Sequence, residues 1–93
     1  MELNYSEHRI FMTDKAGKTI AEVTFPAISK DIVNINHTFV DDSLRGQGIA
    51  GRLLLAVAQT MRKKQIKAYP TCSYAIDWFS KHPEYADIYS SHP

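Results

Sequence analysis

Residues 42–50 read Asp-Ser-Leu-Arg-Gly-Gln-Gly-Ile-Ala, and the hydrophobic periodicity of the chain changes across them. Before them, Asp31–Val40 is rich in β-branched residues and alternates as a strand does. After them, apolar residues recur at helical spacing. Gly46 and Gly48 allow a sharp turn and leave no Cβ in the way of a ligand. The sequence therefore predicts a strand, a glycine turn and a helix in succession.

The first N–H groups of the predicted helix have no partner within it. Together with the helix dipole they form a site suited to phosphate. Arg45, at the mouth of the turn, adds a guanidinium that can bind two phosphate oxygens at once. A plainer interpretation stays open, in which both glycines serve only the tight connection, since a lone glycine-rich turn is a weak signal. The turn lacks the G-K-[ST] ending of a P-loop.

The second half of the chain predicts two helices around a short strand. The first helix follows Gly48, and its apolar stripe is formed by Ile49, Leu53, Val57 and Met61. A short buried strand is expected over Ile66–Tyr69, where Pro70 ends it. A second helix is expected over Ser73–Lys81. The residues that we expect to face inward from this helix are Ala75, Ile76, Trp78 and Phe79.

The first half of the chain predicts a three-stranded antiparallel meander. Its strands are Arg9–Thr13, Lys18–Phe25 and Asp31–Val40, with a turn signal between the first two. Unbroken alternation in the third strand would place four side chains on one apolar face: Val33, Ile35, His37 and Phe39. A meander followed by helix, strand and helix is an α+β, or mixed α/β, pattern.

Composition narrows the class of protein. The 93 residues predict a single domain over 1–93, with a flexible tail over 89–93. A net charge of +1 gives no reason to expect nucleic-acid binding, and the longest apolar run, Leu53–Ala58, is too short for a membrane span. No signal peptide is expected. The single cysteine, Cys72, predicts a reducing, cytoplasmic compartment. No metal site is expected, because no C-x-x-C is present and only His82 among the histidines has a ligand spacing from Cys72.

The residues of the glycine turn resemble a known family motif. Arg45-Gly46-Gln47-Gly48-Ile49-Ala50 matches the Q/R-x-x-G-x-G/A signature of the GNAT superfamily of acetyl-CoA-dependent N-acetyltransferases. The chain resembles a small, single-domain branch of that superfamily from about Lys18 to Tyr85. Further marks are His37-Thr38-Phe39-Val40 before the loop, then Cys72 and His82-Pro83-Glu84-Tyr85.

The resemblance implies a cofactor and a place for it. Acetyl-CoA would lay its pantetheine arm in a cleft where the strand ending at Phe39 and Val40 splays from Ile66–Tyr69. Backbone groups of Phe39 and Val40 would bind that arm. The pyrophosphate would lie on the turn formed by Arg45, Gly46, Gln47, Gly48, Ile49 and Ala50.

Acetyl transfer to an amine requires a proton acceptor. A lysine-like amine is almost fully protonated at pH 7, which costs roughly 4.6 kcal/mol before attack. His37 is the candidate general base, because histidine titrates near neutrality. The alternative for His37 is a buried histidine satisfied by hydrogen bonds. The backbone N–H near Val40 is the candidate donor to the oxyanion.

Cys72 is the second candidate catalytic residue. The resemblance places it beside the cleft, where a helix N-terminus would favour its thiolate and allow it to carry the acyl group. The alternative is a small buried apolar residue. His82 either pairs with Cys72 or caps a helix end.

Two departures from the superfamily pattern keep other functions open. Phe79 stands where many members carry a tyrosine that protonates the departing thiolate, and Pro26–Lys30 is too short to build an acceptor site. The acceptor site would then be open or supplied by a partner, which suits a protein or peptide as the unidentified amine acceptor, or no acceptor at all. The sequence predicts an acetyltransferase. The alternatives are a non-catalytic CoA-binding module and a protein-interaction domain, and no oligomeric state is indicated.

Overall fold

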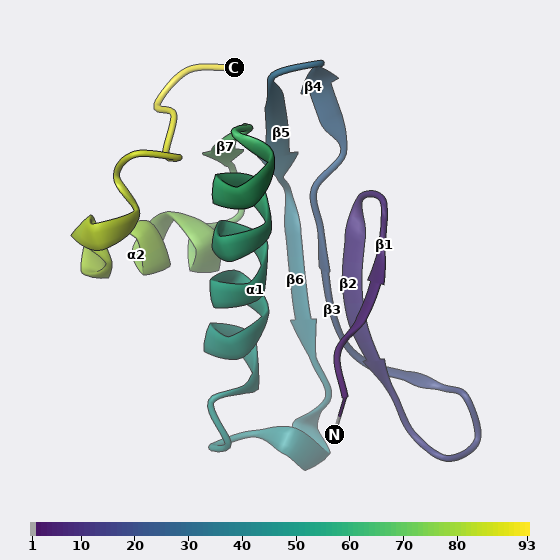
Figure 1. Cartoon of the computed structure of the whole chain (residues 1–93). Coiled ribbons are helices and arrows are strands. Elements are labelled where there is room, and N and C mark those ends of the chain that lie inside the picture. The colour runs from purple at the N-terminus through teal and green to yellow at the C-terminus, as the bar shows by residue number, and fades with distance from the viewer. Residues whose placement is uncertain (1) are drawn as a thin grey trace.

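The computed structural model describes residues 2–93, in which two small sheets pack with two α-helices (Figure 1). The strands are β1 (Asn4–Ser6), β2 (Arg9–Thr13), β3 (Thr19–Thr24), β4 (Ala27–Ser29), β5 (Ile32–Ile35), β6 (His37–Val40) and β7 (Lys67–Pro70). The helices are α1 (Ile49–Lys64) and α2 (Ser73–Lys81), with short 3-10 turns η1 (Asp42–Leu44) and η2 (Pro83–Tyr85).

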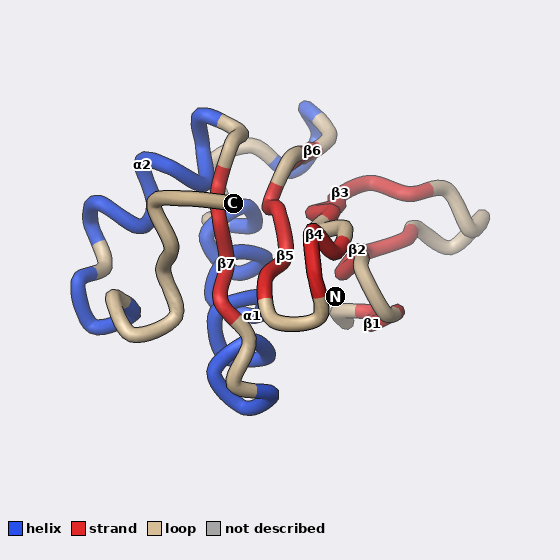
Figure 2. The backbone as a smooth tube through the Cα atoms, turned by 90° about the horizontal axis from the view of Figure 1, so that it is seen from above, coloured by secondary structure: helices blue, strands red, loops and turns tan. Residues whose placement is uncertain are grey.

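The strands divide between two sheets. The first contains β1, β2, β3 and β6 in this order, and all its pairs are antiparallel. The second contains β4, β5 and β7, with β5 antiparallel to β4 and parallel to β7. Seen from above, β5 lies between β4 and β7, and α2 lies outside β7 (Figure 2). The predicted α+β class is confirmed, and the structure adds β1 and β4.

The prediction of one long third strand is wrong, because Asn36 divides it into β5 and β6. Val33 pairs with Ala27 in one sheet, whereas His37 pairs with Thr24 in the other. His37 follows Val33 by four positions, whereas their pairing partners, Thr24 and Ala27, are only three positions apart. One extra residue reverses the alternation, so His37 leaves the buried face that Val33 occupies.

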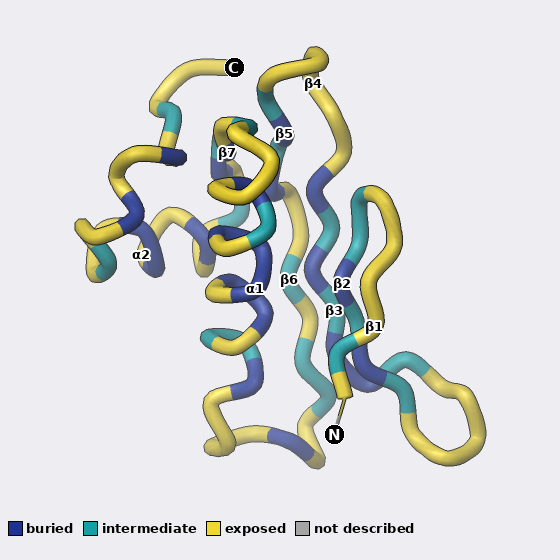
Figure 3. The backbone as a smooth tube through the Cα atoms, viewed as in Figure 1, coloured by how far each residue is buried: buried dark blue, intermediate teal, exposed yellow. Residues whose placement is uncertain are grey.

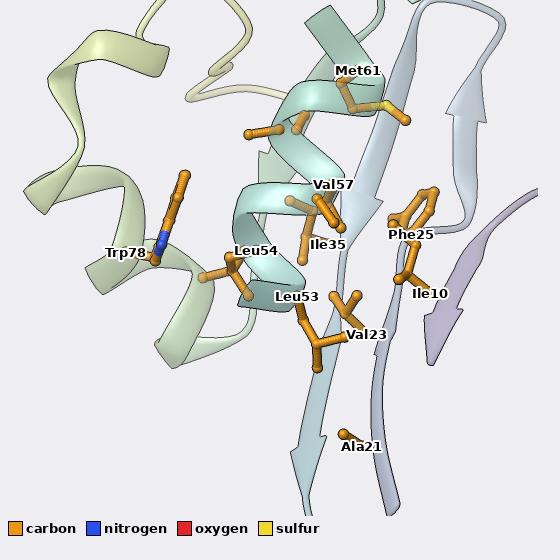
Figure 4. Close-up of a cluster of buried hydrophobic side chains, with 14 of the residues drawn as sticks. Ile10, Ala21, Val23, Phe25, Ile35, Leu53, Leu54, Val57, Met61 and Trp78 are labelled. Atoms are coloured by element: carbon orange, nitrogen blue, oxygen red, sulfur yellow. The ribbon is translucent and has the colours of Figure 1, made fainter. Parts of the chain in front are cut away.

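The core lies between α1 and the strands. Leu53 and Val57 point from α1 toward the strands, and Leu54 points toward Trp78 of α2 (Figure 4). These three α1 side chains are fully buried, and the helix exposes its opposite side to solvent (Figure 3). Burying each leucine or valine contributes roughly 1.5–3 kcal/mol, so α1 is fixed firmly against the sheet that leads into the turn.

The last strand and the last α-helix lie close to their predicted positions in the sequence. The bounds of α2 are as predicted, and β7 is the expected short strand displaced by one residue. Ala75, Trp78 and Phe79 face inward as expected, whereas the prediction for Ile76 is wrong, since it is 50% exposed. Ser90 N–H donates to the Ala68 carbonyl at 2.8 Å. Neither helix of residues 2–93 has the length and apolar character that a membrane span requires.

Candidate functional site

The glycine turn holds two left-handed residues. Gly46 has φ +82 and Gly48 has φ +70, in the region that L side chains rarely adopt. Before them, the Asp41 carboxylate accepts from the Ser43 backbone N–H at 3.0 Å and its hydroxyl at 2.6 Å. These bonds lower the pKa of Asp41 and fix η1. The turn is therefore shaped by two glycines and one capping carboxylate.

A pocket of about 390 Å³ opens beside this turn. Its lining residues are Thr38, Val40, Leu44, Arg45, Gly46, Gly48, Ile49, Ala50 and Tyr74. Gly48 is the N-cap of the 16-residue α1 and makes no side-chain cap bond. The cap residue therefore provides no hydrogen-bond acceptor to the first N–H groups of α1. The positive end of the helix dipole lies at the rim of the pocket. This arrangement is suited to an anion.

Arg45 supplies a guanidinium at the rim. Its Nε lies 2.8 Å from Asp42 Oδ1, and the two side chains are 78% and 86% exposed. An ion pair this exposed is worth little, so an arriving phosphate can compete for the guanidinium. Asp42 also places a negative charge close to the turn, which opposes anion binding there.

The structure brings together most of the predicted cofactor residues. Val40, Arg45, Gly46, Gly48, Ile49 and Ala50 all line the pocket. Phe39 and Gln47 do not: Phe39 lies on the outer face of β6, beside Glu22 of β3, and Gln47 lies in the turn with its side chain exposed. Any contact of these two residues with a ligand in the pocket would therefore have to come from their backbone groups.

Sequence reasoning missed Tyr74 as a pocket residue. It belongs to the first turn of α2, and its hydroxyl lies 3.8 Å from the position that a Cβ on Gly51 would take. A phenol thus reaches over the start of α1, where it can donate to a bound group. Only the packing of α2 against α1 brings it there, and no local pattern in the sequence signals that packing.

Cys72 lies at the point where the two sheets separate. β6 is the edge strand of its sheet, and β7 bonds to β5 instead. The Ile35 carbonyl accepts from both Thr71 and Cys72 N–H groups, at 3.0 and 3.3 Å. The Cys72 sulfur caps α2, accepting from Ala75 N–H at 3.4 Å, and lies 3.3 Å from the Thr38 hydroxyl. A thiol is therefore held beside a pocket-lining residue.

The two histidine candidates have different surroundings. His37 is 52% exposed, so its expected place on the buried face is wrong; its Nε2 lies 3.5 Å from Glu22 Oε2. His82 bonds the Trp78 carbonyl through Nδ1 at 2.7 Å and stacks on the Trp78 ring. His82 thus ends α2, which confirms the capping interpretation. Within residues 2–93, no three His, Cys, Asp or Glu side chains come together as a metal site.

The sequence, compared with known protein families, matches one of them. The model of the GCN5-related N-acetyl-transferase family matches residues 9–88. The chain belongs to this family. The resemblance read from the glycine turn is confirmed by that match, which spans every strand from β2 onward, both helices and the pocket.

Individual proteins and solved structures are also similar to this chain. Protein NATD1 of Gallus gallus and of Homo sapiens are each 33% identical over 63 residues, or 68% of this chain. The chain spans a little over half the length of these relatives, 57% and 56%. A GCN5-like candidate N-acetyltransferase from Staphylococcus aureus is 32% identical, with a TM-score of 0.80 over 96% of this chain and 87% of that one.

A more distant structure shares the fold alone. Rv2747 from Mycobacterium tuberculosis, solved in complex with CoA, has a TM-score of 0.64 and 19% identity. The match covers 82% of this chain and 47% of that protein. The GNAT fold of this chain is therefore found within larger proteins as well as in small ones.

Proposed function

We propose that this protein binds acetyl-CoA with the pyrophosphate on the Arg45–Ala50 turn and transfers the acetyl group to an amine. The observation that carries the proposal is the pocket at the N-terminal end of α1, whose cap residue has no side chain. A Cβ built on Gly46 or Gly48 meets no atom within 4 Å, so open space lies where a phosphate could approach the backbone. Family membership and the CoA complex of Rv2747 support the same ligand.

Each part of the pocket takes a part of the ligand. The backbone N–H groups of Ile49 and Ala50, with Arg45, would hold the pyrophosphate. Thr38 and Val40 would line the pantetheine arm on the free edge of β6. The bound cofactor would supply an acyl group activated as a thioester. Thr38, whose hydroxyl lies 3.3 Å from the Cys72 sulfur, would line the path from the pocket toward Cys72.

Two side chains would take part in transfer. His37 would accept the proton of the amine. Because its imidazole lies on the outer face of β6, opposite the pocket-lining side of Thr38, this role requires the amine to approach the acyl group from that outer face. Cys72 offers a covalent route, in which its sulfur bonds the acetyl carbon, the bond from that carbon to the CoA sulfur breaks, and the thiol proton of Cys72 passes to the departing CoA thiolate. The amine then forms its bond to that carbon and Cys72 leaves as the thiol. If the amine instead attacks the acetyl group of acetyl-CoA directly, only His37 is needed.

A second candidate function is a binding module for CoA without efficient transfer. One observation favours it: Phe79 is buried in α2, where many family members would place a phenol acid. The pocket's phenol, Tyr74, belongs instead to the start of α2 and lies over the phosphate end of the pocket.

Titration calorimetry with acetyl-CoA tests the shared part of both functions. We expect micromolar binding that weakens in Arg45→Ala and is unchanged in Arg62→Ala, whose guanidinium pairs with Asp87 instead. No heat of binding with a folded wild type would refute both functions.

Release of CoA thiol in the presence of lysine-containing peptides then separates the enzyme from the binding module. Incubation with acetyl-CoA alone, followed by mass spectrometry, tests the covalent route: an added acetyl group should appear on the wild type and be absent from Cys72→Ala. Unchanged turnover in Cys72→Ala would leave direct transfer as the route.

A further inference from the structure

The outer face of the first sheet carries a cluster of three charged or titratable side chains, none of which lines the pocket. Glu22 of β3 stands directly between Phe11 of β2 and Phe39 of β6 in the strand register. In the next row, Thr24 stands between Arg9 and His37. Residues paired across strands point to one face, and diagonal neighbours on that face lie within reach of long side chains. Arg9, Glu22 and His37 thus come from three strands to one place.

Arg9 is fixed on this face by three contacts. Its Nε donates to Glu22 Oε1, and its Nη2 donates to Thr19 Oγ1 at 2.9 Å. Its guanidinium carbon lies 3.7 Å from the centroid of the Phe11 ring, a cation–π contact. An arginine held by a carboxylate, a hydroxyl and a ring has little freedom left. The carboxylate that it binds is therefore fixed as well.

Glu22 presents its second oxygen to a histidine. Oε2 lies 3.5 Å from His37 Nε2, while Oε1 accepts from Arg9. The glutamate side chain is only 22% exposed, whereas the imidazole is half exposed. We propose that Glu22, clamped by Arg9, is a positioning residue that holds the Nε2–H tautomer of His37 and so leaves Nδ1 to accept a proton from the acceptor amine. The catalytic part of this inference rests on the proposed function.

The chemistry of the pair explains why the tautomer matters. A neutral imidazole has one N–H donor and one accepting nitrogen, and the partner of one nitrogen decides which it is. An ionised carboxylate only accepts, so Glu22 selects a proton on Nε2. A base with its proton on the wrong nitrogen cannot accept another where it is needed, even when its position is unchanged.

The variant Glu22→Gln reverses this selection with little change of shape. Arg9 still requires an acceptor, so the amide oxygen stays toward Arg9 and the amide NH₂ turns toward His37 Nε2. That nitrogen must then accept, and the proton moves to Nδ1. Glu7→Gln removes the same charge from an exposed glutamate in the β1–β2 turn and serves as the matched control.

Long-range ¹H–¹⁵N spectra of the histidine rings, recorded in alkaline buffer where imidazole is neutral, report the tautomer without any substrate. We expect His37 as Nε2–H in the wild type and in Glu7→Gln, and as Nδ1–H in Glu22→Gln. An Nδ1–H wild type, or a tautomer that Glu22→Gln leaves unchanged, overturns the proposal.

Turnover of acetyl-CoA with lysine-containing peptides tests the catalytic part. Glu22→Gln should lower kcat by about ten-fold or more, with calorimetric affinity for acetyl-CoA unchanged, and Glu7→Gln should match the wild type. Equal kcat in the two variants overturns the role of Glu22 and leaves the proposed function standing. A wild type with the expected tautomer and no turnover overturns the enzymatic function, and the catalytic role of Glu22 with it.

Discussion

Replacing Gly48 with alanine separates the folding role of the turn from its proposed binding role. Gly48 has φ +70 at the start of α1, and Gly17 has φ +84 in the turn between β2 and β3. A Cβ built on either glycine meets no atom within 4 Å. Backbone strain is therefore the folding cost that the two alanine variants share, and only the Gly48 variant places its methyl group beside the pocket.

The expected sizes of the two effects follow from that geometry. An L residue in the left-handed region costs roughly 1–2 kcal/mol, and a domain of this size loses about 4–8 °C of Tm per kcal/mol. Both variants should therefore melt several degrees below the wild type. A methyl group that displaces one charge-assisted phosphate contact should cost a further 1.5–3 kcal/mol of binding, or roughly a ten- to hundred-fold rise in Kd. Only Gly48→Ala should show this second loss.

Calorimetry with acetyl-CoA and thermal unfolding of the same samples measure both effects. The result that refutes the reasoning is a folded Gly48→Ala whose Kd equals that of Gly17→Ala, because the phosphate would then lie away from the turn. A Gly48→Ala variant with the Tm of the wild type would instead refute the claim that an L residue is strained at this position. The two failures are distinguishable, since one is read from affinity and the other from stability.

Three further outcomes follow from particular contacts. Asp42→Asn should tighten acetyl-CoA binding about two- to five-fold, and less at high salt, because it frees the guanidinium of the turn; calorimetry at two salt concentrations measures this. Leu53→Ala should lower the free energy of unfolding by about 2–5 kcal/mol, and Leu55→Ala, at a 38% exposed position, by far less in urea titrations. The Arg62 hydrogen bond holds the pKa of Asp87 below its ordinary value of 3.8, so its stabilisation is present above about pH 4 and lost as pH falls through the lowered pKa. Asp87→Asn should remove that acid-dependent component from urea midpoints.

Local signals predicted the parts of the fold that local chemistry determines. The bounds of α2 are those expected, and the structure gives the reason: Cys72 caps its start and His82 ends it before Pro83. The strand β2 was likewise predicted in full, because its alternation is unbroken and a turn follows it.

The face of β6 could not be predicted in this way. Asn36 looks like one more position in an alternating strand, yet the chain on either side of it pairs with different sheets. The extra residue is visible only when both partner strands are known. Its backbone N–H donates to Thr24 at 3.3 Å, and its amide oxygen accepts from the Thr24 hydroxyl at 2.6 Å. A tertiary contact thus decides which side chains of β6 face solvent.

The two halves of the candidate site also differ in how far the sequence predicts them, because only one half is formed by consecutive residues. The proposed phosphate end is one contiguous turn, so its arginine and glycines could be found from spacing alone. The other half is assembled from separate elements: Glu22 reaches His37 across a strand pair, and Cys72 reaches Thr38 across the junction of two sheets. His37 meets Glu22 only because Asn36 reverses the alternation. The same residue in an unbroken strand would face the core, so the extra residue at Asn36 is what exposes the His37 imidazole to solvent.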